Sequence, residues 1–348
     1  MALWDSSVIN SNETAKVFNQ LASKKAVPMV RKKNGLLYAF LGKMEVGGEP
    51  GGGTGFQRLN KVTGKNIEVQ LLGKLPSPAT VADANQIDTA TLTFTTDYWG
   101  GAEFALAHYQ YTHPIPDSEY DRFEGDESKT LSYIDDVMDL VMLGYEKAWG
   151  TAFWVTGTSG APSRTILGSV PFAVAGNNTT GAANWASNGS SYGTIDRTVA
   201  LNADFRGTYE GSIGDLTLKK IRDNKNTVKL AGGLIKLGAS NSAVYGKVEQ
   251  LVEAYTEVNY DKTWSEFGGE YVRYAGITFV LDNYAPAGTL ALLEPDSWGL
   301  WMQATGMTRS GIVFDPSRRG TWVLPTRYWM QLICKCPSHN ALLVDITS

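Results

Sequence analysis

One segment restricts the fold of this chain more than any other: residues 127–149 are predicted to form a long amphipathic helix. Its apolar residues recur at i, i+3, i+7, i+10, i+14 and i+18, which places them on one helical face. These residues are Leu131, Ile134, Met138, Val141, Tyr145 and Trp149. Gly150 is expected to end the helix. About 22 residues at the usual rise give a helix about 33 Å long.

The chain is strongly acidic directly before this helix. The carboxylates there are Asp117, Glu119, Asp121, Glu124, Asp126 and Glu127. Negative side chains interact favourably with the positive N-terminal end of a helix dipole. We prefer this explanation to a catalytic acid pair, because no cleft-forming motif surrounds these residues.

Residues 14–44 form a basic segment in front of a more acidic body. They contain no Asp or Glu, whereas the whole chain has a net charge of -4. Their cations are Lys16, Lys24, Lys25, Arg31, Lys32, Lys33 and Lys43. Such a segment can contact acidic groups of a neighbour or line a space that holds nucleic acid, and Arg31, Lys32 and Lys33 are the candidate contacts. A solvated surface segment is the alternative.

The glycine-rich stretch 47–55 cannot hold regular structure by itself. Beyond it, apolar residues alternate at Ile67, Val69 and Leu71, and again at Leu92 and Phe94. This pattern predicts a long two-stranded excursion rooted near residues 45 and 100. Such an excursion has little core of its own and should need a partner surface.

From residue 151 onward the pattern mixes helices and strands. Helices are predicted within 209–226 and from a Ser242 cap to 255, and strands at 234–237, 271–281 and from 298 onward, including 329–335. Helices placed between strands indicate an α+β protein. A length of 348 residues predicts two compact units plus extensions.

Composition excludes several classes of protein. Hydrophobic residues make up 43% of the chain, which is enough to form hydrophobic cores. Charged residues make up 19%, which is too little for a disordered chain. A net charge of -4 does not suit a dedicated nucleic-acid binder. Neither a signal peptide nor an apolar run of the roughly 18 residues that a membrane helix needs is present, so synthesis in the cytoplasm is expected. The two cysteines, Cys334 and Cys336, are then expected to be reduced thiols.

Motifs that carry catalysis are missing. The glycine runs match neither the phosphate-binding loop nor the dinucleotide fingerprint. Residues 157–161 approach a nucleophile elbow, but Ala161 replaces its second glycine. The chain has three histidines, His108, His113 and His339, and the first two have no acidic partner at informative spacing. No set of His, Cys and carboxylate residues has metal-ligand spacing. We therefore assign no catalytic, cofactor-binding or metal-binding residue, and expect no enzyme and no cofactor.

Several short stretches resemble one known family. They are Tyr192–Arg197, Tyr274–Phe279 with Asp282 and Ala285–Gly288, Trp298–Leu300 and Cys336–Ala341. In this order, over nearly the whole chain, they resemble the major capsid proteins of tailed bacteriophages, which have the Hong Kong 97 (HK97) fold. The resemblance implies an N-terminal arm at 1–45 and an extended β-hairpin loop at 46–100. A peripheral domain at 101–150 and 298–348 would carry the spine helix at about 127–149, and 151–297 would be an axial domain.

The resemblance also implies a function and partners. The chain would assemble, as hexamers and pentamers, into an icosahedral shell around packaged double-stranded DNA, without sequence-specific binding and without a membrane. It would be made in the host bacterial cytoplasm and end in the virion. Portal protein and, as an option, a decoration protein would be further partners. A separate scaffolding protein is expected, because the segment before residue 45 is too short for the scaffolding segment of some relatives.

Some relatives also link a loop lysine covalently to an asparagine. Lys43, Lys61, Lys65, Lys74 and Asn340 would allow such a link in composition, although no spacing requires it.

Two alternative functions stay open at this point. An encapsulin-type protein compartment shares the same fold. A glycan-binding or glycan-cleaving β-rich protein is suggested by the 10 tryptophans, but it would need a carboxylate pair beside exposed Trp in a cleft.

Overall fold

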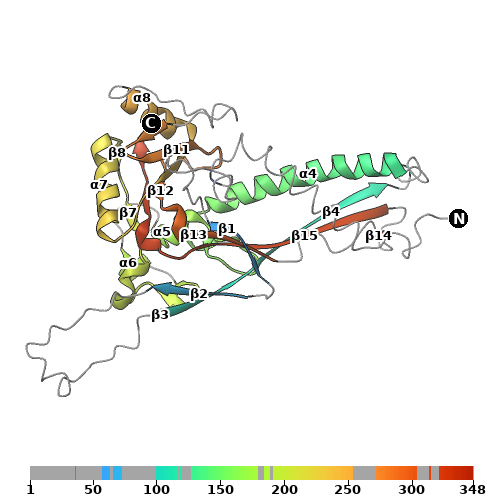
Figure 1. Ribbon diagram of the computed structural model, residues 1–348, viewed down its shortest axis with the longest axis horizontal. Coiled ribbons are helices and arrows are strands. Elements are labelled where there is room, and N and C mark those ends of the chain that lie inside the picture. The colour runs from blue at the N-terminus through green and yellow to red at the C-terminus, as the bar shows by residue number, and fades with distance from the viewer. Residues whose placement is uncertain are drawn as a thin grey trace, which may run out of the picture.

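The computed structural model describes residues 36, 57–62, 66–72, 99–116, 118, 127–178, 184–188, 191–253, 272–303, 313–314 and 321–347. The helices are α4 (Glu127–Phe153), α5 (Val170–Ala175), α6 (Trp185–Asn188), α7 (Leu218–Leu230) and α8 (Ser242–Glu253). Short 3-10 helices are η2 (Gly157–Gly160), η3 (Ala200–Phe205), η4 (Pro295–Ser297) and η5 (Pro337–His339). The predicted α+β class is confirmed (Figure 1).

The longer strands belong to two sheets and one hairpin. They are β1 (Gln57–Val62), β2 (Asn66–Leu72), β3 (Trp99–Ala105), β4 (Ala107–Pro116), β7 (Thr208–Glu210), β9 (Leu237–Ser240), β10 (Val272–Tyr274), β11 (Ile277–Leu281), β12 (Leu290–Leu293), β13 (Trp298–Gln303), β15 (Thr321–Cys334) and β16 (Ala341–Leu343). The two-residue strands are β5 (Ser191–Tyr192), β6 (Ile195–Asp196), β8 (Gly214–Asp215), β14 (Val313–Phe314) and β17 (Ile346–Thr347).

A six-stranded sheet with the order β10-β11-β9-β12-β16-β7 separates two hydrophobic cores. Alternate side chains of a strand point to opposite faces. Phe279 and Leu292 accordingly pack with α7 and α8 in one core, whereas Val280 and Leu293 belong to the other. The second core also contains α5 and the C-terminal half of α4. The sheet is therefore covered on both faces.

Helices α7 and α8 begin at polar caps. The Thr217 hydroxyl accepts a hydrogen bond from the amide of Lys220, so α7 starts at Leu218. The predicted helix within 209–226 was wrong in its first half, because 208–210 and 214–215 form β7 and β8, which pair with β16 and β17. The helix predicted from Ser242 is confirmed as α8. The side chain that caps it belongs to Asn241, whose Oδ1 accepts a hydrogen bond from the amide of Val244 in the first turn.

The second sheet extends far to one side of the molecule (Figure 1). In it β4 pairs antiparallel with β15 over ten residues, from Ala107 with Met330 to Pro116 with Thr321. Helix α4 runs along this ribbon and buries Val137, Val141, Tyr145, Trp149 and Phe153. The predicted helix is confirmed, but Gly150 does not end it. Burial of Phe153 outweighs the roughly 1 kcal/mol that a glycine costs inside a helix.

A separate hairpin is formed by β2 and β3, in register from Asn66 with Ala105 to Leu72 with Trp99. The sequence predicted two paired strands in this part of the chain, and β2 does pair with a second strand, β3, which starts at Trp99. The predicted alternation at residues 92–94 lies outside the described residues. The base of the hairpin is buried through Ile67, Ala102 and Phe104.

Two further strand predictions need correction. Residues 272–281 form the hairpin β10–β11 and not one strand, because Ala275 and Gly276 have φ of 51° and 80° and reverse the chain. The strand predicted at 234–237 lies at Leu237–Ser240. The final strand predicted at 329–335 is confirmed as the end of β15. Within the described residues, no helix combines the length and apolarity that crossing a membrane requires.

Candidate functional site

The elongated part of the molecule is held together by stacked aromatic rings. Tyr145 and Trp149 of α4 lie 5.4 Å apart between ring centroids, and Trp149 lies 5.0 Å from Tyr328 of β15. Burial raises the pKa of the Tyr328 hydroxyl well above its usual value. Offset aromatic contacts add stability beyond the area they bury. These contacts hold the C-terminal half of α4 against β15.

The outward face of α4 is unusually apolar for a solvent-exposed helix. Leu140 is 55% exposed and Leu143 is 42% exposed. Next to them, Gly144 has no heavy atom within 4 Å of the position where a Cβ would lie. Exposed apolar groups that gather on one element indicate a contact surface for another protein. We name Leu140, Leu143 and Gly144 the helix patch.

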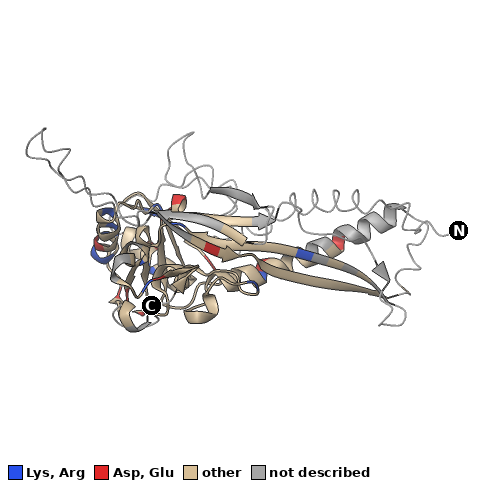
Figure 2. Ribbon diagram, turned by 90° about the horizontal axis from the view of Figure 1, so that it is seen from below, with Lys and Arg blue, Asp and Glu red and all other residues tan. Residues whose placement is uncertain are grey.

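A second exposed surface lies on α7. This helix carries five cations and one anion within 13 residues, so its net charge is +4 and the rest of the chain has a net charge of -8. Lys and Arg gather on it in Figure 2. Its last residue, Leu230, is 91% exposed, and Leu234 just beyond is also exposed. The surface therefore combines positive charge with an apolar end.

Gln331 fixes the root of the ribbon. Its side chain is fully buried, and its Oε1 accepts from the amide of Gly168 at 2.6 Å. Its Nε2 donates to the carbonyls of Ala105 and Ser163 at 2.7 and 3.2 Å. One amide thus joins β15 to the β3–β4 junction and to the loop at 163–168.

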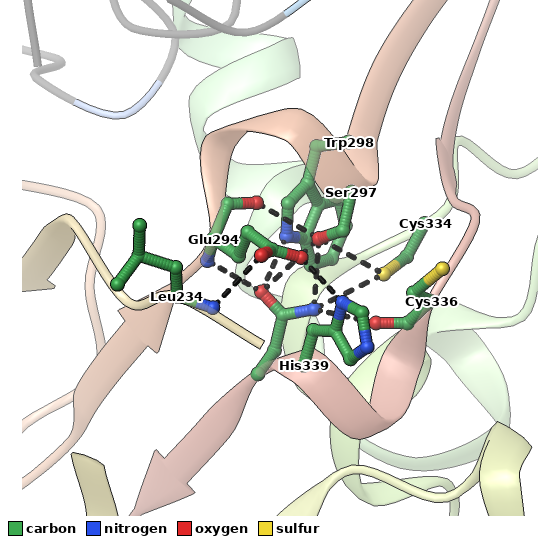
Figure 3. Close-up of polar contacts among 8 residues, drawn as sticks. Leu234, Glu294, Ser297, Trp298, Cys334, Cys336 and His339 are labelled. Atoms are coloured by element: carbon green, nitrogen blue, oxygen red, sulfur yellow. Dashed lines mark hydrogen bonds and ion pairs between the residues drawn. The ribbon is translucent and has the colours of Figure 1, made fainter. Parts of the chain in front are cut away.

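Asn340 forms a similar set of hydrogen bonds just beyond the C-terminal end of β15. Its Oδ1 accepts from the amide of Glu294 and from the Trp298 indole, at 2.9 and 2.8 Å. Its Nδ2 donates to the Ser297 hydroxyl and the Cys336 carbonyl, at 3.0 and 2.9 Å. Figure 3 shows Glu294, Ser297 and Trp298 converging around this node. Because the amide is fully buried and its hydrogen-bonding groups are occupied, it offers no free group for a covalent link to a lysine.

His339, next along the chain, contacts Glu294 through Nδ1 and Oε2 at 2.6 Å. The other Glu294 oxygen accepts from the amide of Leu234 at 2.8 Å. Hydrogen bonding to Glu294 raises the pKa of His339. The pair connects the loop after α7 with the end of β12 and with η5 (Figure 3).

Arg197 is a fully buried cation in an aromatic cage. Its guanidinium lies 5.2 Å from the ring centroids of Phe172 and Tyr192 and 5.1 Å from that of Trp185. It donates to the carbonyls of Phe172 and Ala173 at 2.9 and 2.7 Å. Burial lowers the pKa of Arg197 to about 10. These contacts tie α5 to the β5–β6 turn, on which the base of the β2–β3 hairpin rests.

The histidines and the serine considered for catalysis lie on three different elements. His108 and His113 lie in β4, where His108 stacks on Trp329 at 4.2 Å, and His339 lies in η5. Burial and Arg327 lower the pKa of His108. Ser159 is exposed in η2. Among the described residues, no group of His, Cys, Asp and Glu could hold a metal ion.

The cysteines and tryptophans also have structural positions. Cys334 and Cys336 are free thiols, and burial raises the pKa of both, so that they stay neutral. Trp149, Trp154 and Trp298 are buried, and Trp185, Trp301 and Trp329 are half-buried. Where tryptophan burial is described, it therefore does not suit an exposed glycan-binding cleft.

Other predicted site residues cannot be compared with the structure. Arg31, Lys32 and Lys33 lie outside the described residues, as do the carboxylates at 117–126. Sequence reasoning assigned no role to Gln331 or Arg197, because their partners are mainly backbone groups of distant segments. Asn340 was noted in one of the stretches that carry the family resemblance and as a candidate for a covalent link.

Comparison with known proteins gives a likeness at the level of structure. No family model and no curated protein sequence matches this chain. A chain of the cyanophage A-1(L) capsid matches with a TM-score of 0.59 and 16% identity, over 84% of this chain and 91% of that one. The chain has the HK97-like capsid fold.

Other shell proteins share this fold with the chain. The capsid of an empty GTA particle matches with a TM-score of 0.51 and 12% identity, over 83% of this chain and 88% of that one. The SrpI encapsulin of Synechococcus elongatus PCC 7942 has the same TM-score at 9% identity, over 83% and 84% of the two chains. The HK97-like fold thus occurs both in phage-type capsids and in a protein compartment.

Proposed function

We propose that this chain is the major capsid protein of a tailed bacteriophage and assembles into the icosahedral shell that encloses its double-stranded DNA. The observation that carries the proposal is the likeness to the cyanophage capsid chain over 91% of that chain's length. A likeness of this extent includes the whole plan of the subunit and not one shared motif.

The shape of the subunit supports this function. A closed shell requires each copy to form large interfaces with several neighbours. The β4–β15 ribbon with α4, together with the β2–β3 hairpin, gives more lateral surface than a globule of equal mass (Figure 1). The helix patch and the exposed Leu230 supply apolar groups on two separate elements. We assign both to contacts with further copies of this chain.

The division into parts is also proposed. The arm would be 1–45, the extended loop 46–100, the peripheral domain 101–150 with 298–348, and the axial domain 151–297. In support, five of the six strands in the six-stranded sheet fall within 151–297, and β16 comes from the return segment. The ribbon falls outside 151–297, and so does α4 except for its last three residues, 151–153.

Partners and location follow from the same proposal. The shell would form in the host cytoplasm with a separate scaffolding protein and a portal, and a decoration protein is an optional partner. It would hold DNA without reading its sequence, and it would need no cofactor and no catalysis. The neutral thiols of Cys334 and Cys336 and the stacking of His108 on Trp329 suit this assignment, because they are packing roles.

An encapsulin-type compartment is the second candidate, and the match to the SrpI encapsulin supports it. The two functions differ in cargo and in the need for helper proteins. A compartment closes around a protein cargo, whereas a phage head requires a scaffold and is filled with DNA.

Electron microscopy after expression tests the proposal. We expect closed shells of uniform diameter when the chain is expressed with the scaffolding protein of its genome neighbourhood. Sedimentation that shows only monomers or dimers under all conditions would contradict any shell function. Uniform shells that form without a scaffold and enclose protein would favour the compartment.

A further inference from the structure

Asp282 is a buried carboxylate that serves two segments of the chain. It directly follows β11 and is fully buried, and its own amide donates to the Ser240 carbonyl of β9 at 2.8 Å. Its Oδ1 accepts from the amide of Tyr284 at 2.9 Å, which forms a local turn. Its Oδ2 accepts from the amide of Leu36 at 3.1 Å, although 246 residues separate the two.

Leu36 enters the body of the protein at this point. Its side chain is fully buried and belongs to the main hydrophobic core. Both the amide and the side chain of Leu36 are therefore held by the body, one by a hydrogen bond and the other by packing. Leu36 is inserted into the body and does not rest on its surface.

The chemistry of position 282 suits this double contact. A carboxylate has two oxygens that each accept a hydrogen bond, whereas an asparagine side chain has only one. Burial raises the pKa of Asp282 to about 6, and the amides of Tyr284 and Leu36 together with the Trp154 side chain oppose that shift. Burial, Glu146 of α4 and Asp282 together raise the pKa of Tyr284, so Tyr284 and Glu146 are titratable groups that act on this turn. A carboxylate kept in such a costly place indicates a need for both acceptors.

We propose that Asp282 is the docking site of the N-terminal arm on the body of its own chain, and that its contact with Leu36 fixes the arm at this point. The occupant is this chain's own segment at Leu36. The consequence for assembly rests on the proposed shell function, whereas the docking itself does not. An arm that starts from a fixed point binds a neighbour with a smaller loss of conformational entropy.

The test uses Asp282→Asn in the full chain, with Asp223→Asn as the matched control. Asp223 is an exposed carboxylate on α7 that pairs with Lys219 at 2.6 Å, so its loss should leave the arm unaffected. In Asp282→Asn, the Leu36 amide should exchange hydrogen about tenfold faster or more, and the arm should be cleaved faster by protease. The amides of β9, β11 and β12 should keep their protection. Unchanged exchange at Leu36 in a folded variant would overturn the proposal.

A second variant covers the case in which Asp282→Asn does not fold. Deletion of residues 1–36 removes the occupant and leaves Asp282 in place. The six-stranded sheet should remain folded, while assembly decreases. If the deletion abolishes the cooperative unfolding transition, the body cannot fold without this segment, and docking is the wrong description. Because exchange is measured on unassembled subunits, a failure of the unmodified chain to form shells would refute the proposed function and leave the docking result standing.

Discussion

Glu294 and His339 form a contact of 2.6 Å between Oε2 and Nδ1, and each side chain is mostly buried. The same carboxylate accepts from the amide of Leu234 through its other oxygen. The contact joins the loop after α7 to the segment that carries Asn340. It therefore links parts of the chain that are far apart in the sequence.

The Glu294–His339 contact predicts a specific pH dependence of the free energy of unfolding. Because Glu294 raises the folded-state pKa of His339, the stabilisation is complete below the unfolded value of 6.5 and is lost as pH rises through the folded value. His339→Gln should lower the free energy of unfolding by about 1.5–3 kcal/mol at pH 6 and by less at pH 9. Urea unfolding at both pH values measures this. Glu294→Gln should remove the same dependence, and an equal loss at both pH values would contradict the assignment.

The Asn340 node predicts a large loss of stability. Asn340→Ala leaves the buried Trp298 indole and the amide of Glu294 without their acceptor. Buried groups that lose their partner each cost about 1–3 kcal/mol, so we expect a total of about 3 kcal/mol in thermal or urea unfolding. Asn226→Ala on the exposed face of α7 is the control and should change stability by less than about 0.5 kcal/mol. A small effect at Asn340 would mean that the node is not needed for stability.

Gly193 and Gly214 provide a matched pair. Both have φ of +62°, so an alanine at either position is strained. At Gly193 the added Cβ would also lie 3.0 Å from the Glu103 carbonyl and from the Phe104 ring, whereas at Gly214 nothing lies within 4 Å. Gly193→Ala should therefore destabilise the protein by about 1–2 kcal/mol more than Gly214→Ala, and hydrogen exchange should increase at the base of the β2–β3 hairpin. Equal losses would show that this close contact relaxes without cost.

The helix patch predicts an assembly defect without a folding defect. Replacing both Leu140 and Leu143 with glutamate should leave the melting temperature nearly unchanged, because both side chains are exposed. Shell yield should fall at least about tenfold, because burying two unpaired charges at an interface is costly. Lys147→Ala on the same exposed face is the control. Normal shells from the double variant would place the subunit contact elsewhere.

The sequence predicted α4 well because its apolar period is long and local. Its end was missed because Gly150 carries a stop signal whose cost is smaller than the gain from burying Phe153. The helix predicted within 209–226 was wrong in its first half, because Ile213 and Leu216 fit a helical period although their segment is not helical. Their segment instead pairs with β16 and β17, more than a hundred residues away.

The hydrogen bonds of the buried polar side chains could not be predicted from the local sequence, for a related physical reason. Arg197, Asp282 and Gln331 bind mainly backbone groups. Every residue type offers nearly the same backbone groups, so the identity of the partner residue does not reveal the contact. Asp282 was noticed only through the family resemblance, which gave its place and not its role. No sequence pattern near Gln331 indicates that Gly168 and Ala105 lie beside it.

The basic arm remains a prediction and can be tested by charge removal. Residues 14–44 carry seven cations and no anions, and cations crowded in this way repel one another unless counter-charges lie nearby. In a shell, the anions of a neighbouring subunit, a scaffold or packaged DNA would supply those charges. Replacing Arg31, Lys32 and Lys33 together with glutamine should then weaken assembly or genome retention. The defect should be larger at low salt, where charge pairing contributes most.

The position of the arm in an assembled shell decides this last prediction. A reconstruction should place Arg31, Lys32 and Lys33 against a neighbour or the shell interior. The control is Lys219→Gln on α7, which removes an exposed cation that is already paired with Asp223. This change should alter assembly little, because exposed ion pairs contribute about 0–1 kcal/mol. If the three cations instead lie on the outer surface in solvent, the basic segment is only a hydrated face, and the triple variant should assemble as the unmodified chain does.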